Sequence, residues 1–162
     1  MLLSVFIHES GHLLLMWIFD CVPTEIRLIP GSVQICGPVC AGRPSVLISL
    51  AGPFANIVVF AVVFFSSIML GDSYYITFSI VNLVYGIFNL LPLAGLDGGS
   101  ALEEALIKIK GAVIARRILN IITVCVAVFV FSVAVFLSFI GRANYSVYIL
   151  ALYLVLSVLF KF

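Results

Sequence analysis

Charged side chains are scarce in this chain of 162 residues. Lys, Arg, Asp and Glu make up 9% of it, whereas a soluble globular domain carries about 25%. Hydrophobic residues reach 64%, and several uncharged apolar runs are long enough to be transmembrane helices. The net charge is only +1 and no basic cluster is present, which excludes a nucleic-acid partner. The composition therefore predicts an integral membrane protein surrounded by the lipid bilayer.

Cysteines are also few, and they make no dense disulfide framework. The four lie at positions 21, 36, 40 and 125. Cys36 and Cys40 could form a second metal site or a redox pair, but they lack neighbouring ligands. We expect free thiols.

The N-terminal apolar run lacks both marks of a secretory signal peptide, a positively charged start and a small-residue cleavage site. We therefore expect its helix to belong to the working protein. The run begins abruptly, only seven residues before His8, which points to a further segment upstream.

Five apolar runs predict an all-α polytopic membrane protein with about five transmembrane helices. They cover about residues 1–19, 46–70, 75–93, 118–140 and 146–160. We expect a single transmembrane domain over residues 1–162, with a catalytic core at 1–110 and two C-terminal helices in 118–162.

Two shorter patterns lie between these runs. Residues 25–29 and 32–36 alternate polar with apolar side chains around Pro30-Gly31, which predicts a short β-hairpin beside the membrane. Residues 98–117 have apolar positions at helical spacing and predict an amphipathic surface helix.

Lys and Arg are distributed unevenly across the five expected crossings. Seven fall on the side of the hairpin and the amphipathic segment, and only Arg142 falls on the other. By the positive-inside rule the first side is cytoplasmic. We expect a multi-pass protein of the cell membrane.

The chain has only two histidines, and both lie in an H-E-x-x-H pentad at residues 8–12. In residues 1–19 the ionisable side chains are His8, Glu9 and His12. A charge at the centre of a membrane helix costs roughly 2.5–3.5 kcal/mol, so such groups are rarely accidental. Positions i and i+4 share one helix face, so both imidazoles can bind one Zn²⁺ ion while Glu9 acts as the general base for the attacking water.

A catalytic zinc site takes three protein ligands, and no third histidine exists. The third must be a carboxylate or a cysteine, and Asp97 is the best candidate. Pro92 and the glycines around Asp97 predict that the helix breaks near the membrane. An aspartate before two glycines is also a common turn residue, so a structural role stays open.

Three asparagines lie within the second and third apolar runs, at positions 56, 82 and 89. Asn56 follows Gly52-Pro53, a pair that we expect to bend its helix. Asn56 and Asn89 are candidate substrate-binding residues that could orient a peptide backbone or stabilise an oxyanion. They could equally be bridges between helices.

These motifs, in order, resemble the site-2 protease family of intramembrane zinc metalloproteases. The residues are His8-Glu9-x-x-His12, Gly52-Pro53-x-x-Asn56, and Asn89-x-x-Pro92 followed by Leu96-Asp97-Gly98-Gly99. The resemblance implies zinc ligands at His8, His12 and Asp97 and a general base at Glu9. It covers about residues 4–110. It is strongest with the compact bacterial branch, which includes a sporulation protease, although more membrane sequence usually precedes the pentad.

The resemblance implies cleavage of a membrane-associated or single-span regulatory protein, such as a sigma-factor precursor or anti-sigma factor, with regulatory membrane proteins as further partners. It also implies that the hairpin edge captures unwound substrate. The alternative is a catalytically inactive membrane scaffold that binds transmembrane partners. A metal transporter ranks last, because the chain has only one ligand cluster.

Overall fold

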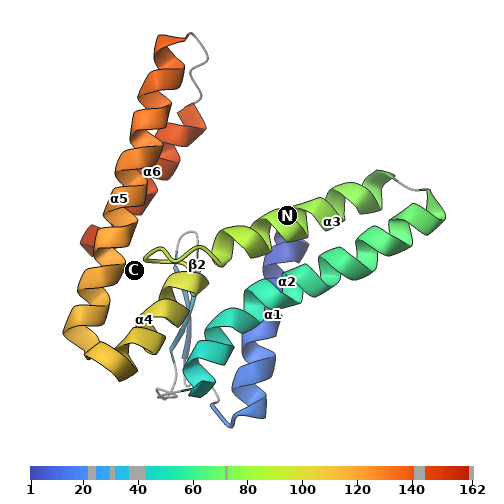
Figure 1. Ribbon diagram of the computed structural model, residues 1–162. Helices are drawn as coiled ribbons and strands as arrows, with labels where there is room; N and C mark the ends of the chain where they lie inside the picture. Colours follow the sequence, from blue (N-terminus) through green and yellow to red (C-terminus); the bar gives the residue numbers. More distant parts are fainter. Residues whose placement is uncertain (22–24, 30–31, 37–42, 72, 141–144, 161–162) are drawn as a thin grey trace. The chain divides into compact units, whose positions relative to one another are not determined.

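The computed structural model describes residues 1–21, 25–29, 32–36, 43–71, 73–140 and 145–160. The chain divides into two compact units, Met1–Leu90 and Leu91–Phe162. The described residues form six helices and one pair of strands, and Figure 1 draws them in colours that follow the sequence.

The first unit is built from three apolar helices, α1 (Leu2–Ile18), α2 (Arg43–Leu70) and α3 (Ser73–Asn89). Helix α2 packs against both of the others. Small residues allow these close approaches: a Cβ on Gly11 would lie 2.7 Å from the Ala51 carbonyl oxygen, and one on Gly86 would lie 3.0 Å from that of Pro53. Small residues at helix contacts are typical of membrane proteins, where backbones must approach closely.

Strands β1 (Glu25–Ile29) and β2 (Ser32–Cys36) fall on the two alternating runs of the sequence. They pair antiparallel, with Glu25 opposite Cys36 and Ile29 opposite Ser32. The Pro30-Gly31 turn lies outside the described residues.

The second unit begins with an irregular segment, residues 91–96, and continues with α4 (Asp97–Lys110), α5 (Ala112–Phe139) and α6 (Tyr145–Phe160). Helix α5 packs against both α4 and α6. Gly111 separates α4 from α5 with a φ of 81°, a conformation that favours glycine. An ion pair between Arg116 Nε and Glu103 Oε1, 2.8 Å long, links the two helices beyond this turn.

Three predicted helix boundaries need correction. The apolar run 75–93 gives a helix that ends at Asn89, because Pro92 cannot continue the backbone hydrogen bonds. The amphipathic segment 98–117 is not one helix: α4 ends at Lys110, and residues 112–117 form the first turns of α5. The fourth apolar helix accordingly starts at Ala112 rather than near Ile118.

The expectation of free thiols is wrong at one position, since Cys21 is disulfide-bonded. A rule based on compartment considers only the redox surroundings, whereas the spatial approach of two cysteines decides whether a bond can form. Cys125 is a free, exposed cysteine.

Two helices of the described chain are long and apolar enough to cross a membrane, at Pro44–Met69 and Ala112–Phe139. Their 26 and 28 residues rise about 39 and 42 Å at 1.5 Å per residue, against a hydrocarbon core of about 30 Å. Polarity is inverted relative to a soluble protein. Ser4, Asn56, Asn82 and Thr123 are buried, whereas Phe6, Trp17, Phe65 and Phe129 are exposed. This distribution suits an all-α protein that faces lipid.

Candidate metal centre

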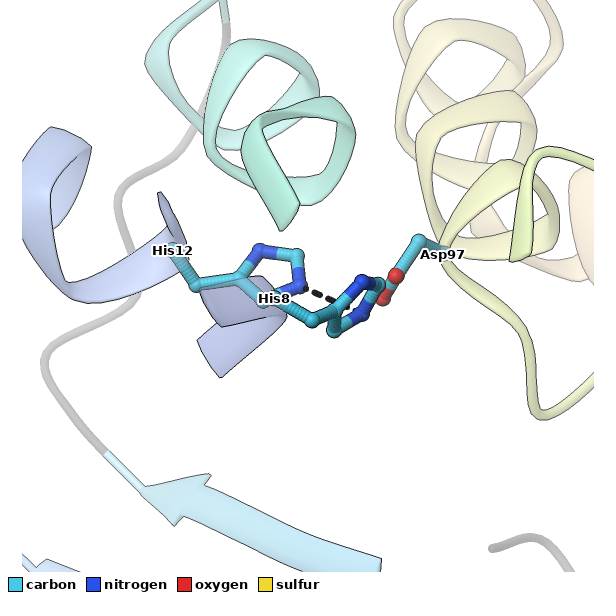
Figure 2. Close-up of side chains that lie close together, drawn as sticks. All are labelled: His8, His12 and Asp97. Carbon is cyan, nitrogen blue, oxygen red and sulfur yellow. Dashed lines mark hydrogen bonds between the residues drawn. The ribbon is translucent and has the colours of Figure 1, made fainter. Parts of the chain in front are cut away.

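The two histidines of the pentad lie one turn apart on the buried face of α1, together with Ser4. Their Nε2 atoms are 3.2 Å apart, and the rings meet edge to face with centroids 4.8 Å apart. Figure 2 draws the predicted ligand residues and marks the contact between the imidazoles. Two nitrogen ligands at about 2.0–2.1 Å from one tetrahedral zinc ion stand about 3.3–3.4 Å apart. The spacing of the two Nε2 atoms therefore fits a shared ion.

The backbone of α2 fixes the orientation of the His12 ring. His12 Nδ1 lies 2.7 Å from the Ile48 carbonyl oxygen, and a carbonyl can only accept, so Nδ1 carries the proton and donates it. In a neutral imidazole the other nitrogen, Nε2, is then unprotonated and presents a lone pair. A metal-binding histidine almost always donates its second ring N–H in this way.

Two side chains hold the His8 ring. Asn56 Nδ2, on α2, lies 3.3 Å from His8 Nδ1, and the ring of Tyr85, on α3, meets the imidazole edge to face at a centroid distance of 5.0 Å. Asn56 is fully buried. All three helices of the first unit therefore contribute to the position of His8.

Gly52 leaves the space that the His12 imidazole occupies. A Cβ at this position would collide with His12 Nε2 and lie 2.8 Å from Cδ2 and Cε1 of the same ring. The Gly52-Pro53 pair stands within α2, which continues as helix through Pro53. The glycine therefore has a role in making room for a predicted ligand.

Asp97 begins α4 in the second unit, at its first turn, and it is half-buried. A carboxylate is stabilised at a helix N-terminus. The segment before it is fixed on α5, because the Ala94 N–H donates to Thr123 Oγ1 at 2.9 Å and the Thr123 hydroxyl donates to the Leu119 carbonyl at 2.9 Å. Gly99 completes the turn, since a Cβ there would collide with the Leu93 carbonyl.

The remaining predicted residues lie on two helices of the first unit. Glu9 is half-buried on α1, about 100° around the helix from His8. Asn89 is buried at the end of α3, where its Nδ2 donates to the Tyr85 carbonyl at 3.0 Å. Because the structure defines the two units separately, the convergence of Asp97 on the two histidines stays a prediction, as do the roles of Glu9 and Asn89.

Several residues that shape this site carry no recognisable signal in the sequence. The Ile48 contact is made by a backbone carbonyl, and Thr123 lies in an apolar run without a motif. Tyr85 was likewise not identified as a neighbour of His8. The Gly52-Pro53 pair was visible, but it indicated a bend rather than space for an imidazole.

Comparison with known proteins finds a family match and a structural similarity. Residues 70–133 match the model of peptidase family M50, a stretch that contains Asn89, Asp97 and Thr123 but not the pentad. The structure is similar to that of the site-2 protease from Methanocaldococcus jannaschii, with a TM-score of 0.75 and 23% identity, over 97% of this chain and 73% of that one. No curated protein gives a significant match. The match to peptidase family M50 covers less than half of the chain, and the structural similarity shows a shared fold.

Proposed function

We propose that this chain is an intramembrane zinc endopeptidase that hydrolyses a peptide bond in or next to a transmembrane segment of another protein. The observation that carries the proposal is the histidine pair. Two imidazoles on the interior face of an apolar helix point their Nε2 atoms at each other, and the Nδ1 proton of one is held by a backbone carbonyl. The match of residues 70–133 to peptidase family M50 supports protease chemistry rather than metal transport.

His8, His12 and Asp97 are the proposed ligands of the zinc ion. Two imidazoles and one carboxylate form a donor set typical of catalytic zinc, which also needs an open position. When bound by these residues, the ion would supply Lewis acidity for polarising a peptide carbonyl and the attacking water. Asp97 starts a helix and follows a segment anchored by Thr123, so its carboxylate has a rigid support.

Glu9 is the proposed general base. It accepts a proton on its carboxylate from the attacking water and passes it to the leaving amine. This is the usual role of the glutamate in an H-E-x-x-H motif. Asn56 and Asn89 remain proposed substrate contacts, through hydrogen bonds to the backbone or the developing oxyanion.

Replacing Glu9 by Gln tests the catalytic role. We expect Glu9→Gln to bind zinc with wild-type stoichiometry and to lose cleavage of a co-expressed single-span substrate, because an amide cannot take up the proton. Zinc is measured on protein purified in detergent, and cleavage by the appearance of the shortened substrate. Cleavage by the variant at the wild-type rate would rule out the general base. It would not by itself restore the scaffold alternative, for which the wild type must also be inactive.

Replacing Asp97 by Ala tests the third ligand. We expect Asp97→Ala to lower zinc affinity by at least about tenfold, since it removes a direct ligand. Loss of a residue that only hydrogen-bonds to a ligand already lowers metal affinity by about 10–100-fold. Glu104→Ala is the matched control, because it removes a carboxylate from the same helix. Equal zinc binding by the two variants would remove Asp97 from the site.

We further propose five membrane crossings, by α1, α2, α3, α5 and α6, with the active site toward the cytoplasmic side. The seven-to-one distribution of Lys and Arg supports this orientation. The substrate is proposed to be a membrane-associated or single-span regulatory protein. The β1–β2 pair offers a strand edge on which an extended segment can add main-chain hydrogen bonds.

A further inference from the structure

The hydrogen bonds of the histidine pair run in one direction. The proton on His12 Nδ1 is committed to the Ile48 carbonyl, so with both rings neutral, His12 Nε2 accepts and His8 Nε2 donates across the 3.2 Å contact. His8 Nδ1 is then an acceptor, and it faces the Asn56 Nδ2 donor at 3.3 Å. In this arrangement His8 carries its proton on the nitrogen that a metal ion would need.

Metal binding requires the opposite tautomer of His8. Its Nε2 must present a lone pair, so the proton moves to Nδ1. Nδ1–H and the Asn56 –NH₂ group would then be two donors facing each other, and the contact would be lost. Asn56 Oδ1 resolves this conflict, because it is a buried acceptor that receives no hydrogen bond from the described part of the chain. A half-turn of the amide puts this oxygen opposite Nδ1, and the two amide ends are nearly equal in shape.

We propose that Asn56 is a positioning residue that sets which nitrogen of His8 carries the proton, and that its amide reverses when His8 takes up a metal ion. The inference rests on the proposed zinc site and gives Asn56 a role distinct from substrate binding. An amide suits this position because it offers a donor and an acceptor at about the same reach. A carboxylate would offer only acceptors.

Asn56→Leu and Asn56→Asp separate this role from simple packing. We expect Asn56→Leu to weaken zinc binding by about 10–100-fold, the range for partners of metal-bound histidines. Asn56→Asp should keep the affinity at or above that of the wild type, because a carboxylate accepts from His8 Nδ1–H. Asn82→Leu is the control, since Asn82 is also a fully buried helix asparagine and its Nδ2 donates to the Phe78 carbonyl of its own helix.

Zinc affinity is measured by competition with a chelator on protein in detergent. Equal losses in Asn56→Leu and Asn82→Leu, an unchanged affinity in Asn56→Leu, or a loss in Asn56→Asp as large as that in Asn56→Leu would each overturn the inference. His8→Ala is included to separate this outcome from failure of the zinc site. If His8→Ala keeps its zinc, the proposed site is wrong, whereas loss in His8→Ala with none in Asn56→Leu rejects only the role of Asn56.

The wild-type protein provides a test that needs no variant. Because the chain has only two histidines, ¹⁵N-labelled histidine gives NMR signals from two imidazoles. We expect the Nδ1 signal of His8 to change from an unprotonated to a protonated nitrogen when zinc is added, while His12 Nδ1 stays protonated throughout. A His8 tautomer that is the same with and without zinc contradicts the reversal.

Discussion

At the residue scale, chemistry alone identified the candidate ligands, but not what orients them. Two histidines at i and i+4 in an apolar helix indicate a metal because charges there are costly. The groups that hydrogen-bond to these histidines could not be predicted in the same way. The partner of His12 is a main-chain carbonyl, which every residue possesses, and the contact joins positions 36 residues apart.

Because Gly52 has no side chain, adding a methyl group there tests how closely His12 fits against α2. Gly52→Ala places a methyl group against the His12 ring and forces the imidazole to move. We expect zinc affinity to fall by about 10–100-fold, as for other changes that reorient a ligand, and the protein to lose about 1–3 kcal/mol of stability through overpacking. Zinc titration and thermal unfolding in detergent measure the two effects.

Gly11→Ala is the comparison for this variant. It crowds the same pair of helices, with a Cβ 2.7 Å from the Ala51 carbonyl oxygen and 2.9 Å from the Ala55 Cβ, but its Cβ contacts are not with the imidazole. We expect similar destabilisation with a smaller loss of zinc. Equal zinc losses would mean that separation of α1 from α2, and not displacement of His12, is responsible.

At the element scale, hydrophobic runs located the helices well and their ends less well. Pro92 was visible as a breaker, yet the helix before it already ends at Asn89. The apolar spacing of residues 98–117 continues across Gly111, so it did not reveal that two helices meet there. The turn requires a positive φ at this glycine, and the Arg116–Glu103 pair spans it.

Replacing Thr123 tests whether its hydroxyl supports the segment that precedes Asp97. Thr123→Val keeps the shape of the side chain but removes the acceptor of the Ala94 N–H. Leaving this part-buried donor without its partner costs up to about 1–3 kcal/mol, so we expect a lower unfolding temperature and, if Asp97 is a ligand, weaker zinc binding. Thermal unfolding with and without zinc measures both.

Thr123→Ser retains the hydroxyl and serves as the matched control. We expect it to remain close to the wild type in zinc binding. If Thr123→Val and Thr123→Ser behave alike in both measurements, the hydrogen bond to Ala94 does not support the segment.

At the scale of the whole molecule, composition correctly predicted an all-α membrane protein, because inverted polarity affects every helix. The number of crossings is harder to derive. Helix α1 has 17 residues, which rise only about 26 Å at 1.5 Å each, so its length alone does not establish a crossing. The connection between the two units could not be predicted either, since it depends on a few residues around Pro92.

Orientation in the membrane can be tested with single cysteines in a background without the natural ones. The Lys and Arg count places α4 in the cytoplasm, so a membrane-impermeant thiol reagent should spare Lys108→Cys in intact cells and modify Tyr74→Cys. Labelling of Lys108→Cys in intact cells would reverse the topology. The disulfide at Cys21 opposes this orientation, because such bonds persist in oxidising compartments and Cys21 falls on the same predicted side as α4. Labelling of Lys108→Cys therefore decides between the two orientations.

On the proposed function, the fit between His12 and α2 would restrict how a substrate enters. The imidazole fills the space beside Gly52 and is hydrogen-bonded to the carbonyl of Ile48, so sliding of α2 along α1 would displace a proposed zinc ligand. We therefore expect α1 and α2 to stay together during cleavage. A crosslink between these two helices should leave cleavage unhindered.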